Sequence, residues 1–334
     1  MEVAFVYDLR DDYRAMGWSE EALAEFDSAE TVEAVAAALQ RAGASVACIG
    51  HGRALAARLV AGQRWDLVFS IAEGASGRSR EAQVPALCEL FDQPYAFSDP
   101  LTMAATLDKA VAKRIVRDAG IVTAPFAVLD TVEAAQALDM AFPLFVKPVA
   151  EGTGKGCSLA SRVTGRAALC TATADLLARF RQPVLVESFL PGREFTIGLL
   201  GTGAAAEVIA VLEVTVARGG GATVYTFDDK EECETRVHYA LATDAEARAA
   251  AAGAVAAYRI LGCRDAARLD FRSDARGVPH FLEVNPIAGL HPTHSDLPIL
   301  TRQSGRSYDW LIAGILHSAM QRYPRPVPLA LAAG

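Results

Sequence analysis

The chain has 334 residues, 52% of them hydrophobic and 22% charged, and its formal net charge is −8. This length suits two or three packed subdomains with a large core better than a single domain. Acidic and basic residues are interspersed along the chain, which argues against nucleic acid or an anionic membrane as the main partner, because both need clustered lysine and arginine.

Residues 1–100 have the alternating strand and helix signals of an N-terminal α/β domain. Apolar runs at 3–7, 45–50 and 66–72 predict strands, and the segments between them have helical spacing. This βαβαβ order predicts an open parallel sheet that binds ligands at the carboxyl ends of its strands. Glu73 follows the third run directly, so we expect it at the ligand-facing edge.

The rest of the chain predicts two further α+β subdomains, at 101–180 and 181–334. A long helix is expected to begin after Ser98, its cap, and to continue through Lys109. A glycine-rich and then acidic stretch, 217–233, is typical of a long loop. Later strands are expected at residues 124–130, 142–149, 184–190, 194–201, 206–216, 267–274 and 280–286.

Neither a membrane span nor a secretion signal is apparent in the sequence. No apolar run approaches the roughly 20 residues that cross a bilayer, and the first residues lack the basic and apolar segments of a signal peptide. The six cysteines are scattered without CxxC spacing, so reduced thiols explain them better than disulfides or zinc. We therefore expect a cytoplasmic protein.

A group of polar side chains follows two neighbouring strands near the C-terminus. Arg268 and Asp270 share one face of their strand, as Glu283 and Asn285 do of theirs. If the turn at 274–279 closes a hairpin, the four side chains meet, and the oxygen atoms of the two carboxylates and the amide suit Mg²⁺. A solvated face with a surface salt bridge is the alternative. The other face should be packed by Leu269, Phe271, Phe281, Leu282 and Val284.

A glycine-rich loop at 151–156 follows the strand that ends near Lys147. Glycines let backbone amides approach phosphate oxygens, and a lysine nearby supplies positive charge. The loop differs from a Walker P-loop, because Lys155 is followed by Gly156 rather than by Ser or Thr. A glycine-rich turn without a ligand is the alternative for the glycines alone, whereas Lys147 needs a counter-charge such as a triphosphate.

These motifs occur in an order that resembles the D-alanine–D-alanine ligase branch of the ATP-grasp superfamily. The resemblance covers nearly the whole chain and is carried by residues 108–109, 146–148, 151–156, 186–196, 268–271, 283–286 and 285–298. It implies an ATP-grasp fold of the α/β (α+β) class, with an N-terminal open parallel-sheet domain and two further α+β subdomains. It also implies ATP and Mg²⁺ as cofactors, with two ions expected and Mn²⁺ as an alternative, and a homodimer.

The resemblance also implies roles for single residues. Lys109 and Lys147 would contact the phosphates of ATP. The positions that would hold adenine and ribose are Glu187, Ser188, Leu190 and Glu194. The ligands of Mg²⁺ would be Asp270, Glu283 and Asn285. Arg268 and the backbone at Gly289 would hold the tetrahedral intermediate.

Four further positions concern the substrates and the loops that close over them. Thr153 stands where the family usually has Ser, and Ser295 falls near a serine that binds the substrate carboxylate. Lys230, the lysine of the mobile loop, is expected among the catalytic residues. It is followed by Glu231, where the dipeptide ligases have Tyr. We weigh a substrate contact by Glu231 equally with a place on the loop surface.

The residues expected around the acceptor depart from the family pattern. Glu73 stands at the place of the usual histidine, and a substrate contact is the favoured interpretation. The N-terminal acid that grips the first substrate has no clean counterpart, with Glu25 and Asp27 as candidates. Carboxylates near the substrate site predict a more cationic or larger partner than two D-alanines.

Three functions follow from the sequence. The favoured one is an ATP-dependent carboxylate–amine ligase that acts through an acyl-phosphate and joins amino acids, or an amino acid and a small acceptor, other than D-alanine with D-alanine. The second is a D-alanine–D-alanine ligase of cell-wall synthesis. The third is a nucleotide-binding module that has lost catalysis, which the intact polar set around Asp270 disfavours. The expected partners are small carboxylate and amine substrates.

Overall fold

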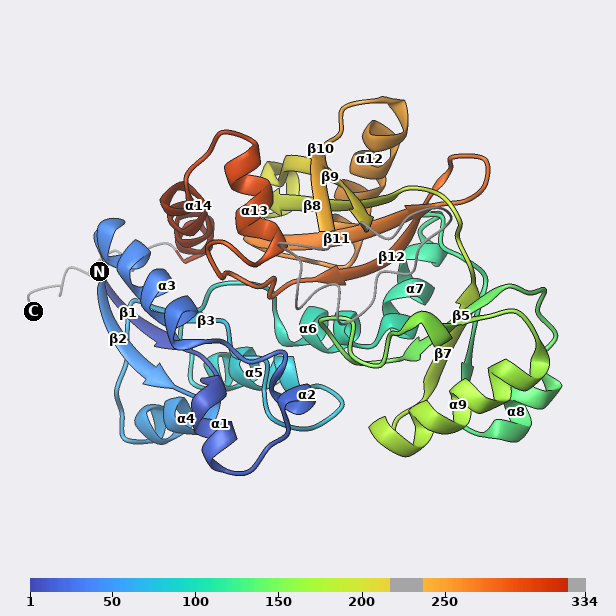
Figure 1. The fold of residues 1–334 in the computed structure, drawn as a ribbon. Coiled ribbons are helices and arrows are strands. Elements are labelled where there is room, and N and C mark those ends of the chain that lie inside the picture. Colours follow the sequence, from blue (N-terminus) through green and yellow to red (C-terminus); the bar gives the residue numbers. More distant parts are fainter. Residues whose placement is uncertain (217–236, 324–334) are drawn as a thin grey trace, which may run out of the picture.

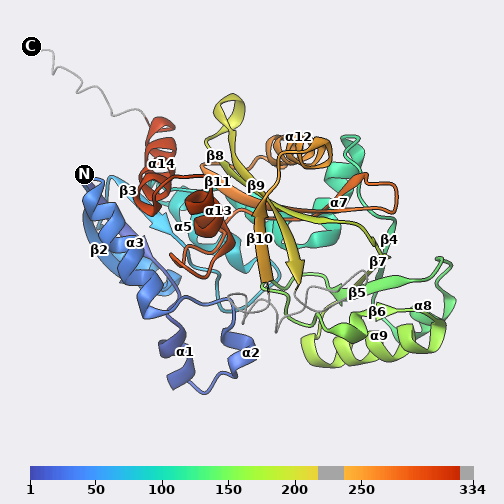
Figure 2. The ribbon, with the colours of Figure 1, turned by 45° about the horizontal axis from the view of Figure 1, so that its top comes forward.

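The computed structural model describes residues 1–216 and 237–323. Lys230 and Glu231 lie outside these residues, so the expectations for them stay predictions. The described chain forms a parallel three-stranded sheet, an antiparallel four-stranded sheet and an antiparallel five-stranded sheet. In Figures 1 and 2 the first two sheets lie at opposite ends of the molecule, with the five-stranded sheet between and above them. This mixed α/β architecture confirms the expected fold class.

The N-terminal domain has the expected βαβαβ order. Its sheet has the order β2-β1-β3, with all strands parallel. The strands are β1 (Glu2–Val6), β2 (Ser45–Gly50) and β3 (Leu67–Ser70). The helices are α1 (Arg10–Ala15), α2 (Glu20–Leu23), α3 (Ala29–Arg41), α4 (Gly52–Val60) and α5 (Gln83–Leu90), with a 3₁₀ turn, η1 (Arg80–Ala82). Glu73 follows β3, which places it at the carboxyl edge of the sheet.

The helix expected after Ser98 is two helices, α6 (Pro100–Leu107) and α7 (Lys109–Asp118). Asp99, rather than Ser98, caps α6 by accepting a hydrogen bond from the backbone N–H of Thr102 at 2.9 Å. Asp108 interrupts the helix because its backbone is extended and its carboxylate caps α7. The interruption places Lys109 in the first turn of α7.

The four-stranded sheet comes from the middle part of the chain, and its order is β4-β7-β5-β6. Its strands are β4 (Phe126–Leu129), β5 (Leu144–Pro148), β6 (Arg162–Val163) and β7 (Val184–Ser188). Two helices pack against it, α8 (Val132–Ala137) and α9 (Arg166–Phe180), and the 3₁₀ turn η2 (Leu159–Ser161) lies between β5 and β6. Because β7 pairs with both β4 and β5, this sheet continues past the division expected near residue 180.

The five-stranded sheet has the order β10-β9-β8-β11-β12. Its strands are β8 (Glu194–Leu200), β9 (Glu207–Val216), β10 (Val237–Leu241), β11 (Ala266–Ser273) and β12 (Pro279–Asn285), with the 3₁₀ turn η3 (Gly203–Ala205) between β8 and β9. Side chains alternate between its faces. One face packs against α7 and α12 (Ala245–Ile260). The buried alanines of α12 let this helix approach the sheet closely. The other face packs against α13 (Asp296–Gln303) and α14 (Tyr308–Gln321).

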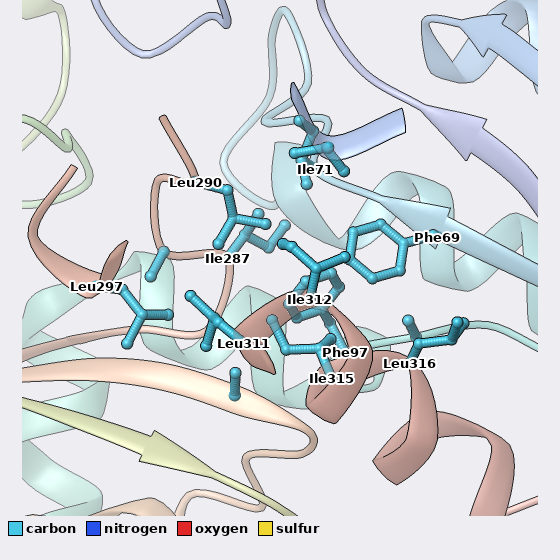
Figure 3. Close-up of a cluster of buried hydrophobic side chains, with 14 of the residues drawn as sticks. Phe69, Ile71, Phe97, Ile287, Leu290, Leu297, Leu311, Ile312, Ile315 and Leu316 are labelled. Carbon is cyan, nitrogen blue, oxygen red and sulfur yellow. The ribbon is translucent and has the colours of Figure 1, made fainter. Parts of the chain in front are cut away.

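A hydrophobic cluster joins the N-terminal sheet to the C-terminal helices. Phe69 of β3 and Phe97 pack with Ile312 of α14, with Ile287 and with Leu297 of α13 (Figure 3). All five side chains are at most 8% exposed. Burial of this kind stabilises the arrangement by about 1.5–3 kcal/mol per large side chain. The cluster therefore holds the loop that follows β12 close to the carboxyl edge of the N-terminal sheet.

Two observations bear on the expectations about location. The five cysteines that the structure describes are all free thiols. Among residues 1–216 and 237–323, no helix is long and apolar enough to cross a bilayer.

Candidate active site

The hairpin predicted around the turn at 274–279 is present. Strands β11 and β12 pair antiparallel, with Arg268 opposite Asn285 and Asp270 opposite Glu283. The side chains of Asp270 and Glu283 are 13% and 16% exposed. The four polar side chains therefore meet on one partly buried surface, as expected, and the alternative of a fully solvated face is wrong.

One residue of this hairpin lies where the sequence did not predict it. The pairing shifts after Asp270, so that Phe271 lies opposite Phe281 and Leu282 is left between the paired positions. Such a bulge turns the extra side chain out of strict alternation. Leu282 consequently lines the same pocket as Glu283. The expectation that Leu282 packs on the opposite face is wrong.

Asp270 is held in place by neighbours from two strands. Its carboxylate accepts a hydrogen bond from the Thr196 hydroxyl of β8 at 2.5 Å and another from Arg268 at 3.1 Å. Arg268 also pairs with Asp296 at 3.0 Å. The hydroxyl of Tyr239 donates to the same Asp296 at 2.8 Å. Asp296 was not predicted from the sequence, because an acidic residue at the start of a helix was the only signal for it.

Two lysines share one buried carboxylate. Lys147 Nζ lies 2.9 Å from one oxygen of Glu187, and Lys113 Nζ lies 2.8 Å from the other. Burial alone would raise the pKa of Glu187, but the two lysines outweigh it and lower this pKa to about 2. Burial would lower the pKa of Lys147, but Glu187 and then Glu283 raise it above its usual range. Both groups are therefore charged at neutral pH.

Lys113 is a component of the site that the sequence did not single out. It is completely buried, it lies four residues after Lys109 on α7, and burial lowers its pKa. The spacing of four places both lysines on one helix face, and this was the signal available in the sequence. Lys109 itself lies 3.5 Å from Glu283, which connects α7 to the hairpin.

A pocket lies between the four-stranded sheet and the five-stranded sheet, and we call it the nucleotide pocket after the role expected from the sequence. Its walls carry Phe145, Phe189 and Leu190 as apolar surfaces, with lysines and carboxylates beside them. Glu194 lines it and pairs with Arg272 at 2.9 Å. The residues expected from the sequence that line this pocket are Lys109, Lys147, Glu187, Ser188, Leu190, Glu194, Asp270 and Glu283.

A second pocket adjoins the nucleotide pocket, and we call it the acceptor pocket after the role expected from the sequence. The two share Lys109, Glu151 and Asp296 in their walls. Its wall brings together the remaining expected residues that the structure describes: Glu73, Thr153, Arg268, Asn285, Gly289 and Ser295. The two pockets together account for every described residue that the sequence analysis proposed.

Gly289 and Ser295 approach each other at the floor of the acceptor pocket. A Cβ atom on Gly289 would lie 2.7 Å from the Ser295 hydroxyl, so a side chain there would displace the serine. The Ser295 hydroxyl accepts a hydrogen bond from the backbone N–H of His291 at 3.1 Å. The His291 ring in turn accepts from the N–H of His294 at 3.2 Å, so these histidines serve the geometry of the loop.

Thr153 lies in the glycine-rich loop with a left-handed backbone. Its φ is +49°, which is strained for a β-branched residue. Its hydroxyl is buried, and no described residue provides a hydrogen-bond partner for it. The flanking Gly154 and Gly156 have φ of +75°, which glycine adopts without strain. A strained residue with an unpaired hydroxyl in a pocket wall is typical of a binding position.

Carboxyl groups gather on the N-terminal side of the acceptor pocket. Burial, and then Glu81 and Glu25, raise the pKa of Glu73 well above its usual range. Burial also raises the pKa of Glu81 to about 7 and that of Asp27 to about 8. Glu25 differs, because Arg80 and Lys155 lie 2.8 and 3.2 Å from its carboxylate. Of the two N-terminal acids proposed as ammonium receptors, Glu25 is thus already paired.

The hairpin residues fit a magnesium ion by their chemistry. Asp270, Glu283 and Asn285 offer hard oxygen atoms, which Mg²⁺ prefers. The amide nitrogen of Asn285 is buried and has no hydrogen-bond partner within the described chain. Lys109 and Lys147 line the same pocket as Asp270 and Glu283, where a triphosphate would meet both sets.

Known proteins resemble this chain in sequence and in fold. A family model described as D-ala D-ala ligase C-terminus matches residues 115–317. An uncharacterized protein of Sinorhizobium fredii is 34% identical over 266 residues, which cover 77% of this chain and 75% of that protein. A D-alanine–D-alanine ligase of Bordetella petrii is 33% identical over 293 residues, which cover 86% of either chain.

The fold matches a solved structure over nearly its whole length. A D-alanine–D-alanine ligase from Bacillus anthracis, crystallised with ATP, has a TM-score of 0.70 and 19% sequence identity to this chain. The match covers 96% of this chain and 98% of that one. The chain therefore belongs to the D-alanine–D-alanine ligase family of the ATP-grasp superfamily, whose members are ATP-dependent ligases that form carbon–nitrogen bonds.

Proposed function

We propose that the protein joins the carboxylate of an amino acid to an amine other than D-alanine, through an acyl-phosphate. The observation that carries this proposal is the acceptor pocket, which adjoins the nucleotide pocket and presents Glu73, Glu81 and Asp27. Burial raises the pKa of all three groups and favours their protonated forms, and the methyl side chains of two D-alanines would not change this. A cationic group on the acceptor would lower these pKa values and pair with the ionised carboxylates.

The nucleotide pocket would hold ATP with its base near Leu190 and its ribose near Glu194. Lys109 and Lys147 would contact the phosphates. Asp270, Glu283 and Asn285 would hold magnesium, with two ions expected; when bound, Mg²⁺ offsets negative charge on the phosphates. The buried pairing of Lys147 with Glu187 supports this assignment, because it fixes the ammonium group in the pocket wall.

The reaction follows from this arrangement. A carboxylate oxygen of the donor attacks the γ-phosphorus, the bond from that phosphorus to the bridging oxygen breaks, and ADP leaves. The amine nitrogen then attacks the acyl carbon, and Arg268 and the backbone at Gly289 would stabilise the oxyanion. The carbon–oxygen bond to phosphate breaks, the nitrogen loses a proton, and the amide and inorganic phosphate are released.

Three residues of the acceptor pocket would orient the substrates. Ser295 would bind a substrate carboxylate, Thr153 would close over it, and Glu73 would contact the acceptor. The unpaired, strained Thr153 and the close approach of Gly289 to Ser295 support these roles. Lys230 and Glu231, in the stretch between β9 and β10, remain candidates for catalysis and acceptor contact.

A second candidate function is the formation of D-alanyl-D-alanine. The curated relative from Bordetella petrii bears the name D-alanine–D-alanine ligase and is 33% identical. That likeness covers 86% of this chain, but it does not explain the carboxyl groups at Glu73 and Glu81.

Phosphate release from Mg-ATP separates the two candidates. We would screen pairs of amino acids and small amines, including ornithine-like and diamine acceptors, and determine the product mass. The proposal predicts an amide product with a cationic acceptor and little D-alanyl-D-alanine. Turnover that is highest with D-alanine alone would favour the second candidate. The homodimer and the cytoplasmic location expected from the sequence stay predictions, which gel filtration and fractionation of cells would examine.

A further inference from the structure

A buried ion cluster joins the N-terminal domain to the glycine-rich loop. The Glu25 carboxylate, which follows α2, lies 2.8 Å from Arg80 of η1 and 3.2 Å from Lys155 of the loop. It also accepts a hydrogen bond from the backbone N–H of Gly152. Lys155 pairs in addition with Glu151. The contacts therefore link two parts of the chain that are far apart in sequence.

The cluster excludes most solvent. The side chains of Glu25, Lys155 and Arg80 are 6%, 8% and 10% exposed. A charge at this depth is costly to leave unpaired, so each member depends on the others. Lys155 can reach Glu25 only while the loop lies against the N-terminal domain. The pair is thus a contact of the closed loop.

The backbone of the loop is shaped for this contact. A Cβ atom at position 152 would lie 2.8 Å from a carboxylate oxygen of Glu25, so only glycine admits the close approach without displacing the acid. Arg80 adds a second link by donating to the backbone carbonyl of Ala150 at 3.0 Å. Lys109 of α7 donates to the carbonyl of Glu151. The start of the loop is therefore held by side chains from two separate elements, η1 and α7.

The position of the cluster relates it to both pockets. Lys155 lines the nucleotide pocket, Glu25 lines the acceptor pocket, and Glu151 lines both. The cluster is consequently part of the wall between the place expected for ATP and the place expected for the acceptor. An acyl-phosphate formed at the junction of the pockets would lie beside it, where water must be excluded.

We propose that Lys155 is a positioning residue which, through Glu25, holds the glycine-rich loop closed and keeps water from the acyl-phosphate. This inference rests on the proposed function for its chemical consequence, but the closure of the loop can be measured without it. It also assigns Glu25 to the loop rather than to the substrate ammonium. The remaining acids, Glu73, Glu81 and Asp27, are then the groups available to an acceptor.

The test compares Lys155→Met with Arg179→Met. Arg179 of α9 also pairs with the N-terminal domain, through Glu21 at 2.5 Å. The side chains of this pair are each 45% exposed. The two variants lose the same charge and gain the same side chain, and they differ in burial. Glu25→Gln is the second variant; it keeps the size of the side chain and an acceptor for the N–H of Gly152.

The first readout is hydrogen exchange of the amides in residues 150–158, with no substrate present. We expect Lys155→Met and Glu25→Gln to exchange at least roughly tenfold faster than the wild type, since each removes a buried charge partner. Arg179→Met should match the wild type. The double variant Lys155→Met with Glu25→Gln should add little to either single change. Equal exchange in all variants would overturn the proposal.

The second readout is the ratio of phosphate released to amide formed. The wild type should give a ratio near one, and Lys155→Met should raise it by roughly tenfold through hydrolysis, with kcat for the amide falling more than KM changes. A raised ratio without faster loop exchange would contradict the positioning role. If the wild type forms no amide with any pair of substrates, the proposed function fails, while the exchange comparison still decides on Lys155.

Discussion

Replacing Glu187 by Gln should destabilise the protein strongly. This carboxylate is 5% exposed and pairs with two buried lysines, at 2.8 Å to Lys113 and 2.9 Å to Lys147. Glutamine has almost the same shape, so the cavity and the packing change little. The substitution therefore isolates the loss of one negative charge between two positive ones.

The size of the effect follows from the pKa of Glu187. It falls from an ordinary 4.5 to about 2, which corresponds to about 3 kcal/mol of stabilisation at neutral pH. Because the pKa is lowered in the folded state, this stabilisation is present above pH 4.5 and is lost as the pH falls toward 2. Removing one partner of a buried pair costs about 3–5 kcal/mol, in agreement.

Urea denaturation at pH 7 provides the measurement. We expect the free energy of unfolding to fall by about 3–5 kcal/mol in Glu187→Gln. Adding Lys113→Met should restore part of the loss, because it removes the charge left unpaired. Glu21→Gln, which breaks an exposed pair, serves as the control and should change stability by less than about 1 kcal/mol.

The pH dependence provides a second check on the same variant. Without Glu187, burial should lower the pKa of Lys113 further, and the folded state then binds fewer protons than the unfolded state. The deficit of Glu187→Gln should therefore shrink as the pH rises from about 7 to 9. A deficit below about 1 kcal/mol at pH 7, or no rescue by Lys113→Met, would refute the account of this cluster.

Three other substitutions test separate parts of the molecule. Arg268→Lys should lower kcat/KM by about 10²–10³ through loss of oxyanion stabilisation, with the KM for ATP nearly unchanged; wild-type turnover would contradict the assignment. Glu73→Gln should shift the kcat/KM preference from a cationic toward a neutral amine by roughly tenfold, and an unchanged preference would remove Glu73 from the pocket's selectivity. Gly198→Ala places a Cβ atom 2.8 Å from Leu297 and Leu300, so the free energy of unfolding should fall by about 1–3 kcal/mol. A thermal scan in which the melting temperature does not fall would contradict this packing.

The hairpin of the site was predictable because its signals are local. Side chains two residues apart share a strand face, and the turn at 274–279 lies between two short apolar runs, so Asp270 and Glu283 were expected to meet. The bulge at Leu282 was not predictable, since nothing in the composition of the strand marks which residue leaves the pairing. The break of the helix at Asp108 had a local cause, a capping carboxylate, but an aspartate inside a helical pattern is common.

The parts of the site that the sequence did not reveal depend on contacts between distant segments. The roles of Lys113, Asp296 and Lys155 depend on ion pairs with Glu187, Arg268 and Glu25, respectively, which lie far away along the chain. Glu25 was a candidate ammonium receptor in the sequence, because the residues that pair with its carboxylate cannot be recognised there. The order of the motifs, by contrast, identified the family, since it does not depend on any single contact.

The fate of the donor oxygen tests the central claim, that the donor carboxylate attacks ATP, most directly. A donor labelled with ¹⁸O in its carboxylate, with Mg-ATP and the best acceptor from the substrate screen, would be analysed by mass spectrometry of the released phosphate. An acyl-phosphate places one carboxylate oxygen on phosphorus, so we predict one ¹⁸O in each phosphate for every amide formed. Unlabelled phosphate alongside an amide product would contradict the mechanism.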